Sequence, residues 1–196
     1  QESRNSVDAV EAALEQVAAV CDAVAAAFDK GGRLFYIGAG TSGRLGVMDA
    51  AECPPTFGVP KGQVVGIIAG GEKCMVQAAE AQEDDAQAGV EDLRKHGLCE
   101  KDVVVGISAS GGAAYVVGAL EYANSVKALG KQVEYLDAAM GHARTRYDNG
   151  FASYLELLTT ESNLFGAQQA LAAAHANHLA SIAKVCLALG GGWQEK

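Results

Sequence analysis

The chain has 196 residues, of which 49% are hydrophobic and 20% charged, and its formal net charge is −9. This length and composition are typical of a globular protein with one sizeable core, and they exclude a disordered chain. The acidic balance argues against a general nucleic-acid binder, which needs a basic face to neutralise phosphates. No apolar run reaches the roughly 20 residues that span a bilayer, and no signal peptide is visible, so we expect a cytoplasmic protein without membrane contact.

The sequence has no pattern typical of a metal site or of a disulfide framework. Its five cysteines are widely spaced, without a CxxC motif or a Cys/His cluster. The four histidines have no third ligand at metal-binding spacing. We therefore expect free thiols and no bound metal.

Apolar residues at helical spacing predict a first helix over residues 6–28. One face of this helix carries Val10, Leu14 and Val17, three or four positions apart. Ser6 is expected to cap its start, and the Gly-Gly pair that follows is expected to end it.

Short apolar runs that end in small-residue turns predict the strands of a parallel sheet. They alternate with helical segments, and right-handed crossovers place those helices on both faces of the sheet. The predicted class is therefore a doubly wound α/β protein. We expect strands at residues 34–37, 64–68, 103–107 and 133–136, and helices through Leu45 and Met48 and at residues 73–95 and 113–129.

The chain is expected to form a single domain over residues 1–196, because no repeat or low-complexity linker divides it. Helices are predicted at residues 138–149 and 162–189. The predicted parts are an N-terminal arm and helix (1–30), a core sheet with phosphate loops (31–136) and a helical C-terminal part (137–196).

The glycine-rich turn at residues 38–43 is the first candidate ligand site. Glycines let the backbone approach a ligand closely, and the amides at the start of the next helix favour an anion. Thr41 and Ser42 add hydroxyl donors. The turn lacks the ending of a Walker loop, and it also fits a tight strand-to-helix connection that binds nothing.

A second serine-rich turn, residues 108–111, repeats this pattern after another predicted strand. Alone, such a turn is more often a helix cap than a ligand site. Ligands of parallel sheets bind at the carboxyl ends of the strands, where both turns fall, so together they predict a sugar-phosphate site. The candidate binding residues are Gly40, Thr41, Ser42, Gly43, Ser108, Ser110 and Gly111.

Two glutamates are candidates for acid–base chemistry. Glu52 precedes Pro54 and Pro55, which are expected to end the helix and hold the carboxylate at a rigid junction. Glu83 lies in an acidic run with Glu80, one helical turn away. The alternative for both is a solvated carboxylate on a helix surface.

At these motifs the sequence resembles the N-acetylmuramic acid 6-phosphate etherases of the SIS (sugar isomerase) superfamily. The resemblance covers about two thirds of the chain and is most specific around Thr41 and Glu52. It implies a doubly wound sheet of about five strands in a flavodoxin-like three-layer sandwich, and a homodimer. It also implies a lyase that uses no cofactor. Such a lyase cleaves the D-lactyl ether of N-acetylmuramic acid 6-phosphate to give N-acetylglucosamine 6-phosphate and D-lactate. In that family Glu52 matches the catalytic acid/base, and Glu83 matches a second implicated glutamate.

The chain also departs from the family pattern. Residues 112–114 read Gly-Ala-Ala where the family usually has Arg-Thr-Pro, and the match decays beyond Leu129. A non-catalytic sugar-phosphate sensor similar to the glucokinase regulatory protein is therefore an alternative. A sugar-phosphate isomerase of the same superfamily fits the fold, but not the block around Glu52.

Overall fold

The computed structural model describes the backbone of residues 9–77 and 82–188, with side chains up to residue 175. Its contacts divide the chain into two compact units. The sheet unit comprises Gln1–Asp84 and Lys101–Val116, and the helical unit comprises Asp85–Glu100 and Val117–Lys196. The predicted N-cap Ser6 and the acidic residue Glu80 lie outside the described residues.

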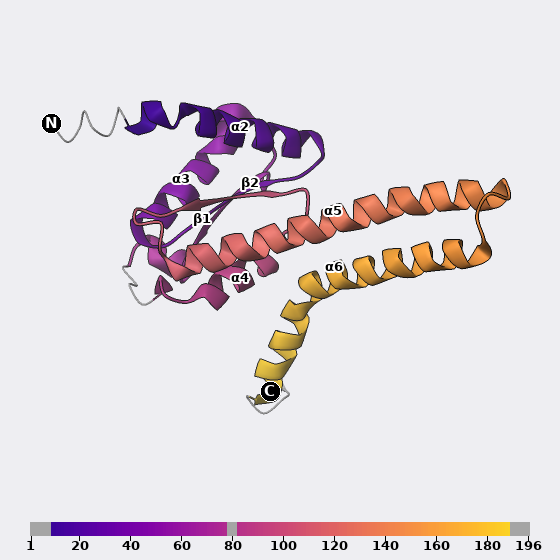
Figure 1. Ribbon diagram of the computed structural model, residues 1–196. Coiled ribbons are helices and arrows are strands. Elements are labelled where there is room, and N and C mark those ends of the chain that lie inside the picture. The colour runs from indigo at the N-terminus through magenta and orange to yellow at the C-terminus, as the bar shows by residue number, and fades with distance from the viewer. Residues whose placement is uncertain (1–8, 78–81, 189–196) are drawn as a thin grey trace. The chain divides into compact units, whose positions relative to one another are not determined.

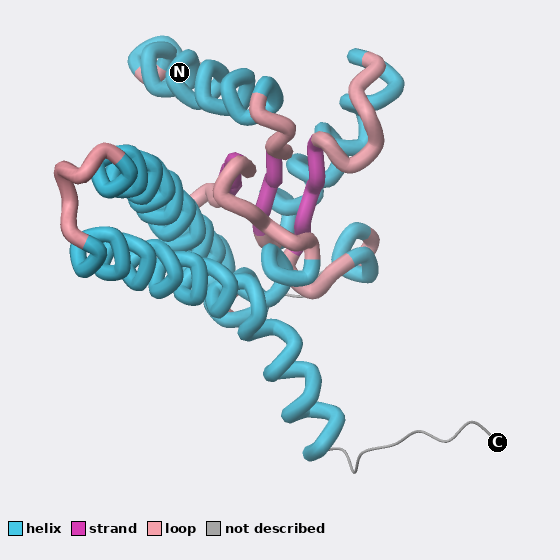
Figure 2. The backbone as a smooth tube through the Cα atoms, turned by 90° about the vertical axis from the view of Figure 1, so that its right-hand side faces the viewer, coloured by secondary structure: helices cyan, strands magenta, loops and turns pink. Residues whose placement is uncertain are grey.

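The sheet unit contains a parallel sheet with the strand order β2-β1-β3, drawn in magenta in Figure 2. Central β1 is buried on both faces, as its continuous apolar run predicts, and Phe35 and Ile37 are fully covered. Gly38 pairs in register with Ile68 and Ile107, so the three strands end together. The α/β class and three predicted strands are confirmed: β1 (Leu34–Gly38), β2 (Val64–Ile68) and β3 (Val103–Ile107).

The strand count differs from the expectation of about five. Among the described residues the sheet has three strands. The fourth predicted strand, residues 133–136, is wrong, because these residues lie inside one continuous helix, α5 (Ala114–Asp148). The predicted helices 113–129 and 138–149 are two parts of that same helix.

Gly130, which directly follows the expected helix over residues 113–129, lies inside α5. A Cβ on Gly130 would lie 2.6 Å from Cγ of Glu100, so the missing side chain lets α5 approach its neighbour closely. The helix therefore continues through a residue that ordinarily weakens it.

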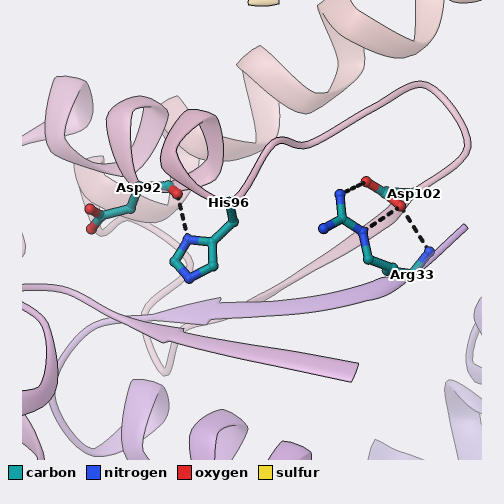
Figure 3. Close-up of polar contacts among 4 residues, drawn as sticks. All are labelled: Arg33, Asp92, His96 and Asp102. Atoms are coloured by element: carbon teal, nitrogen blue, oxygen red, sulfur yellow. Dashed lines mark hydrogen bonds and ion pairs between the residues drawn. The ribbon is translucent and has the colours of Figure 1, made fainter. Parts of the chain in front are cut away.

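The start of β1 is tied to the start of β3 by one ion pair (Figure 3). Arg33 Nη2 lies 2.8 Å from Asp102 Oδ2, and the Arg33 backbone N–H donates to Asp102 Oδ1 at 2.8 Å. The Arg33 guanidinium also stacks over Phe35, 4.8 Å from the ring centre. These contacts fix the entry points of two neighbouring strands.

Helix α3 (Gly40–Phe57) follows β1 directly and packs on β1 and β2 (Figure 1). Its buried side consists of small residues, Gly43, Gly46 and Ala50, which bring the helix axis close to the sheet. A Cβ on Gly46 would lie 2.8 Å from Cβ of Tyr36. The short distance between helix and sheet thus depends on glycine.

The prediction that the prolines end α3 is wrong. Pro54 and Pro55 lie inside the helix, which ends at Gly58 with a φ of 67° and a hydrogen bond from its N–H to the Pro54 carbonyl. The fixed φ of proline matches helical backbone, and only carbonyls of the last turns lose their donors. Glu52 therefore lies within the helix, one turn before its end.

The helix predicted at residues 73–95 is also different in the structure. A short 3-10 helix, η1 (Glu72–Met75), comes first, and α4 (Ala86–Lys95) begins after Asp85. The Asp85 side chain accepts a hydrogen bond from the Ala88 N–H at 3.0 Å, a strong N-cap that sets the start of α4.

Helix α2 (Leu14–Asp29) confirms the predicted first helix over the described residues, but its apolar face is exposed. Ala27 is the one residue of α2 that is buried. The exposed fractions of Leu14 and Val17 are 54% and 49%, and that of Val10, which precedes α2, is 60%. An apolar face without a cover is typical of a surface that meets another protein.

The helical unit is built on a long hairpin of α5 and α6 (Tyr154–Ala188), which lie side by side in both views (Figures 1 and 2). The connection turns at Gly150, whose φ is 75°. Tyr122 of α5 donates to the Ala174 carbonyl at 3.2 Å, and α4 packs against α6. The predicted helix at 162–189 is confirmed over its described residues, which lie within α6. In the part of the chain that the structure describes, no helix has the length and apolarity needed to cross a membrane.

Candidate functional site

A small cavity of about 270 Å³ lies at the carboxyl ends of β1 and β3. This volume is close to the lower end of the roughly 300–1,000 Å³ typical of small-ligand pockets. Both predicted turns contribute to it, so the structure brings together residues that are more than 60 positions apart in the chain. The polar side chains that line it are Thr41, Ser42, Glu83, Ser108 and Ser110. We call this cavity the hydroxyl cradle.

Helix α3 begins at one side of the cradle. Ala39 occupies its N-cap position and makes no side-chain hydrogen bond to the first turn. The partial positive charge of a helix start favours an anion at that place. Gly40 has a φ of 54°, and a Cβ there would lie 3.2 Å from Oε1 of Glu83.

The turn after β3 forms the other side. Ser108 Oγ accepts a hydrogen bond from the Gly111 N–H at 3.0 Å, and Ser110 Oγ accepts one from the Gly112 N–H at 3.2 Å. Because both hydroxyl oxygens accept within the turn, their own protons are directed elsewhere and can be donated to a ligand.

The three predicted glycines shape the cradle instead of lining it. Gly43 donates its backbone N–H to the Ala39 carbonyl at 3.1 Å, and Gly111 has a φ of 72°. Gly40, as above, leaves room beside Glu83. A side chain at any of the three would strain the backbone or fill space between the elements.

Glu83 reaches the cradle from the segment before α4. Its backbone carbonyl accepts a hydrogen bond from the N–H of buried Tyr115 at 3.0 Å. This bond fixes the segment beside the turn that follows β3. The side chain of Glu83 thus lies next to the site at which the sequence predicts a phosphate.

Glu52 lines a different cavity. This open hollow of about 560 Å³ lies between α3 and the sheet. It contains three residues with acid or hydroxyl groups, Tyr36, Asp49 and Glu52, and is otherwise lined by Leu45, Gly46, Met48 and Ile107. We call it the Glu52 hollow. Ile107 borders both cavities.

The structure therefore does not bring the two glutamates together within one chain. Glu52 follows Thr41 by 11 positions on α3, which is about 16 Å along the helix axis at about 1.5 Å per residue. Glu83 lies at the start of α3 and Glu52 lies near its end.

Tyr36 and Asp49 are site residues that the sequence reasoning missed. Tyr36 donates a hydrogen bond to the Asp49 carboxylate, and burial together with that bond raises the pKa of Tyr36 to about 12. Burial and the negative charge of Asp49 also raise the pKa of the Cys53 thiol. One signal was present: Asp49 precedes Glu52 by three positions, on the same side of the helix.

The described residues contain no group of three or more acidic, histidine or cysteine side chains that could hold a metal ion.

Residues 16–124 match the family described as the glucokinase regulatory protein N-terminal SIS domain. The chain therefore belongs to the SIS-domain family. The similar curated proteins are N-acetylmuramic acid 6-phosphate etherases, and the resemblance seen in the sequence is confirmed. The protein of Aliivibrio fischeri strain MJ11 is 58% identical over 128 residues, 65% of this chain and 43% of that protein. The protein of Pasteurella multocida is 56% identical over 64% of this chain and 42% of its own length, and that of Edwardsiella ictaluri is 60% identical over 59% and 38%.

The chain thus spans less than half the length of these relatives.

Proposed function

We propose that the protein is a carbon–oxygen lyase that cleaves the D-lactyl ether of N-acetylmuramic acid 6-phosphate, a step of peptidoglycan recycling in the cytoplasm. The observation that carries this proposal is the hydroxyl cradle with Glu83 beside it, in a chain 58% identical to etherases over 128 residues. The products would be N-acetylglucosamine 6-phosphate and D-lactate.

The cradle suits the phosphate of the sugar. Its Thr41, Ser42, Ser108 and Ser110 hydroxyls and the start of α3 donate to an anion without a cation. A phosphate next to the Glu83 carboxylate would be repelled, so the phosphate should take the hydroxyl side. The sugar carbons would then extend toward Glu83.

Two carboxylates suit the chemistry. One takes the proton from C2, next to the aldehyde of the opened sugar, and the electrons of that bond form a C2–C3 double bond as the ether bond at C3 breaks. An acid gives a proton to the departing lactate oxygen, and water then adds at C3. These steps are proton transfers, so we propose that Glu52 and Glu83 perform them without a metal or organic cofactor.

The separation of the glutamates supports a homodimer in which a second copy supplies Glu52. About five bonds of roughly 1.5 Å each join the phosphorus to C3 of a hexose 6-phosphate, so one sugar cannot bridge about 16 Å. The apolar face of α2 is exposed, and so are Leu45 and Met48 beside Glu52. Contact between two copies would cover such surfaces.

Release of D-lactate from N-acetylmuramic acid 6-phosphate tests the activity. Glu52→Gln should abolish release and leave sugar-phosphate binding nearly unchanged. Unchanged turnover in this variant would rule out the assignment of Glu52.

Mixed dimers test the shared site. Glu52→Gln and a cradle variant such as Ser108→Ala with Thr41→Val should each be inactive alone. Mixing the two after co-refolding should restore activity, because one of the two sites in a mixed dimer then has an intact cradle and an intact Glu52. No recovery in dimers shown to be mixed would contradict a shared site.

The second candidate is a sugar-phosphate sensor without catalytic activity. The match to the glucokinase regulatory protein SIS domain favours it. Tight hexose-phosphate binding with no lactate release would support the sensor and exclude the lyase.

A further inference from the structure

The polar groups that line the Glu52 hollow are all hydrogen-bond acceptors. The Tyr36 hydroxyl keeps its proton and donates a hydrogen bond to Asp49, so toward a ligand its oxygen can only accept a hydrogen bond. Ionised carboxylates such as Asp49 and Glu52 also only accept. A ligand group that enters must therefore bring its own N–H or O–H donor.

The opposite side of the hollow is apolar. Leu45, Met48 and Ile107 line it, and the exposed fractions of Leu45 and Met48 are 53% and 59%. A methyl group placed against them would leave water with a favourable free energy. A carboxylate would be repelled by Asp49 and would find no donor.

A secondary amide with a methyl group has both features. Its N–H can be donated to the acceptor wall, and its methyl group can pack on the apolar side. In the sugar phosphate proposed above, that group is the acetamido substituent on C2. The free lactyl carboxylate does not fit the hollow.

Because Asp49 and Glu52 are close together, an acetamido group bound at Asp49 would also place C2 of the sugar near Glu52. Asp49 and Glu52 are three positions apart on α3, so their side chains are neighbours on one side of the helix. An acetamido nitrogen held at Asp49 is bonded to C2, the carbon that loses its proton. Its proton would then lie beside the Glu52 carboxylate.

We propose that Tyr36 and Asp49 are specificity and positioning residues that hold the 2-acetamido group of an amino-sugar phosphate in the Glu52 hollow. The proposal rests on the proposed function for the identity of the sugar. It assigns Tyr36 to fixing the Asp49 carboxylate and Asp49 to binding the amide N–H.

Binding measurements with two sugar phosphates test the roles of Tyr36 and Asp49 without any turnover. N-acetylglucosamine 6-phosphate carries the acetamido group, whereas 2-deoxyglucose 6-phosphate has a hydrogen in its place and so no donor for Asp49. The native protein should bind the first roughly tenfold more tightly, as expected for one charged hydrogen bond and a packed methyl group.

Asp49→Asn and Tyr36→Phe should reduce that preference to about twofold or less, and the affinity for 2-deoxyglucose 6-phosphate, which has no group at C2 to contact them, should stay the same. Tyr36→Phe keeps the ring that packs near Gly46, so the sheet and α3 stay in place. Asp29→Asn makes the same charge change at an exposed residue outside both cavities and should preserve the full preference.

Each outcome has one meaning. Equal affinity of the native protein for the two sugars overturns the acetamido site and leaves the lyase proposal standing if lactate is released. A preference that survives both substitutions overturns the assignment of Tyr36 and Asp49. Failure to bind either sugar phosphate overturns the proposed function and this inference together.

Discussion

Arg33 and Asp102 join the first residues of two neighbouring strands through three hydrogen bonds to one carboxylate. The Asp102 side chain is 1% exposed, whereas that of Arg33 is 31% exposed. The pair is therefore asymmetric, because loss of the arginine leaves a buried negative charge and loss of the aspartate leaves a positive charge that water can reach.

This asymmetry predicts which of two substitutions lowers the free energy of unfolding more. Arg33→Met should destabilise the protein by about 3 kcal/mol, since a buried carboxylate loses its countercharge. Asp102→Asn keeps an acceptor for the Arg33 backbone N–H and should cost about 1–2 kcal/mol. Urea unfolding of both variants measures the difference. A larger loss in Asp102→Asn than in Arg33→Met would contradict the role given to burial.

The close packing of α3 predicts opposite effects for two Gly→Ala substitutions. In Gly46→Ala the new methyl group would lie 2.8 Å from Tyr36 Cβ and 3.1 Å from Ile107 Cδ1, so the helix must move away from the sheet. We expect a loss of about 1–3 kcal/mol in unfolding free energy. Gly141 lies inside α5 with nothing within 4 Å of an added Cβ, so Gly141→Ala should stabilise by up to about 1 kcal/mol.

Thermal unfolding of the two variants beside the native protein checks both signs. Equal shifts in the same direction would show that the contact between α3 and the sheet does not limit residue size at Gly46.

Sequence patterns were sufficient to predict the structure of a segment where one residue type dominates it. The apolar run at residues 34–37 is long enough to indicate a strand buried on both faces, and the small residues after β1 and β3 fix both turns. The cradle could be predicted because parallel strands end at one edge of the sheet. Thr41, Ser42, Ser108 and Ser110 therefore come together as expected.

The remaining features depend on contacts between distant segments. The helix expected to end at residue 129 continues through Gly130, where the side chain of Glu100 leaves no room for a Cβ. The hydroxyl of Tyr36 is one polar atom in an apolar strand, and its meaning depends on Asp49 facing it across the space between helix and sheet. Contacts of this kind, between residues on different elements, produce no periodic pattern in the sequence.

The hydroxyl cradle predicts losses in ligand affinity. Ser108→Ala removes a donor to the phosphate and also the acceptor that holds the Gly111 N–H, so the affinity for N-acetylglucosamine 6-phosphate should fall about tenfold or more. Thr41→Val keeps the shape and should cost roughly three- to tenfold. Isothermal titration calorimetry gives both values.

Ser125→Ala is the matched control. Ser125 Oγ donates to the Tyr122 carbonyl within α5, and the residue lines neither cavity. Its affinity for the sugar phosphate should equal that of the native protein. A loss there as large as in Ser108→Ala would mean that the cradle residues act through general stability.

The hydrogen bond between Tyr36 and Asp49 predicts that Tyr36 loses its proton at a higher pH than an ordinary tyrosine. The folded pKa of Tyr36, about 12, is above the ordinary value of 10.0. The stabilisation from keeping this hydroxyl protonated is therefore complete below about pH 10 and is lost as the pH rises through about 12. Ultraviolet absorbance of tyrosinate in the native protein, minus that of Tyr36→Phe, isolates the titration of this residue. In Asp49→Asn the pKa should move toward 10 but stay above it, because burial, the largest cause, is unchanged. An unchanged titration in Asp49→Asn would show that Asp49 does not hold the Tyr36 hydroxyl.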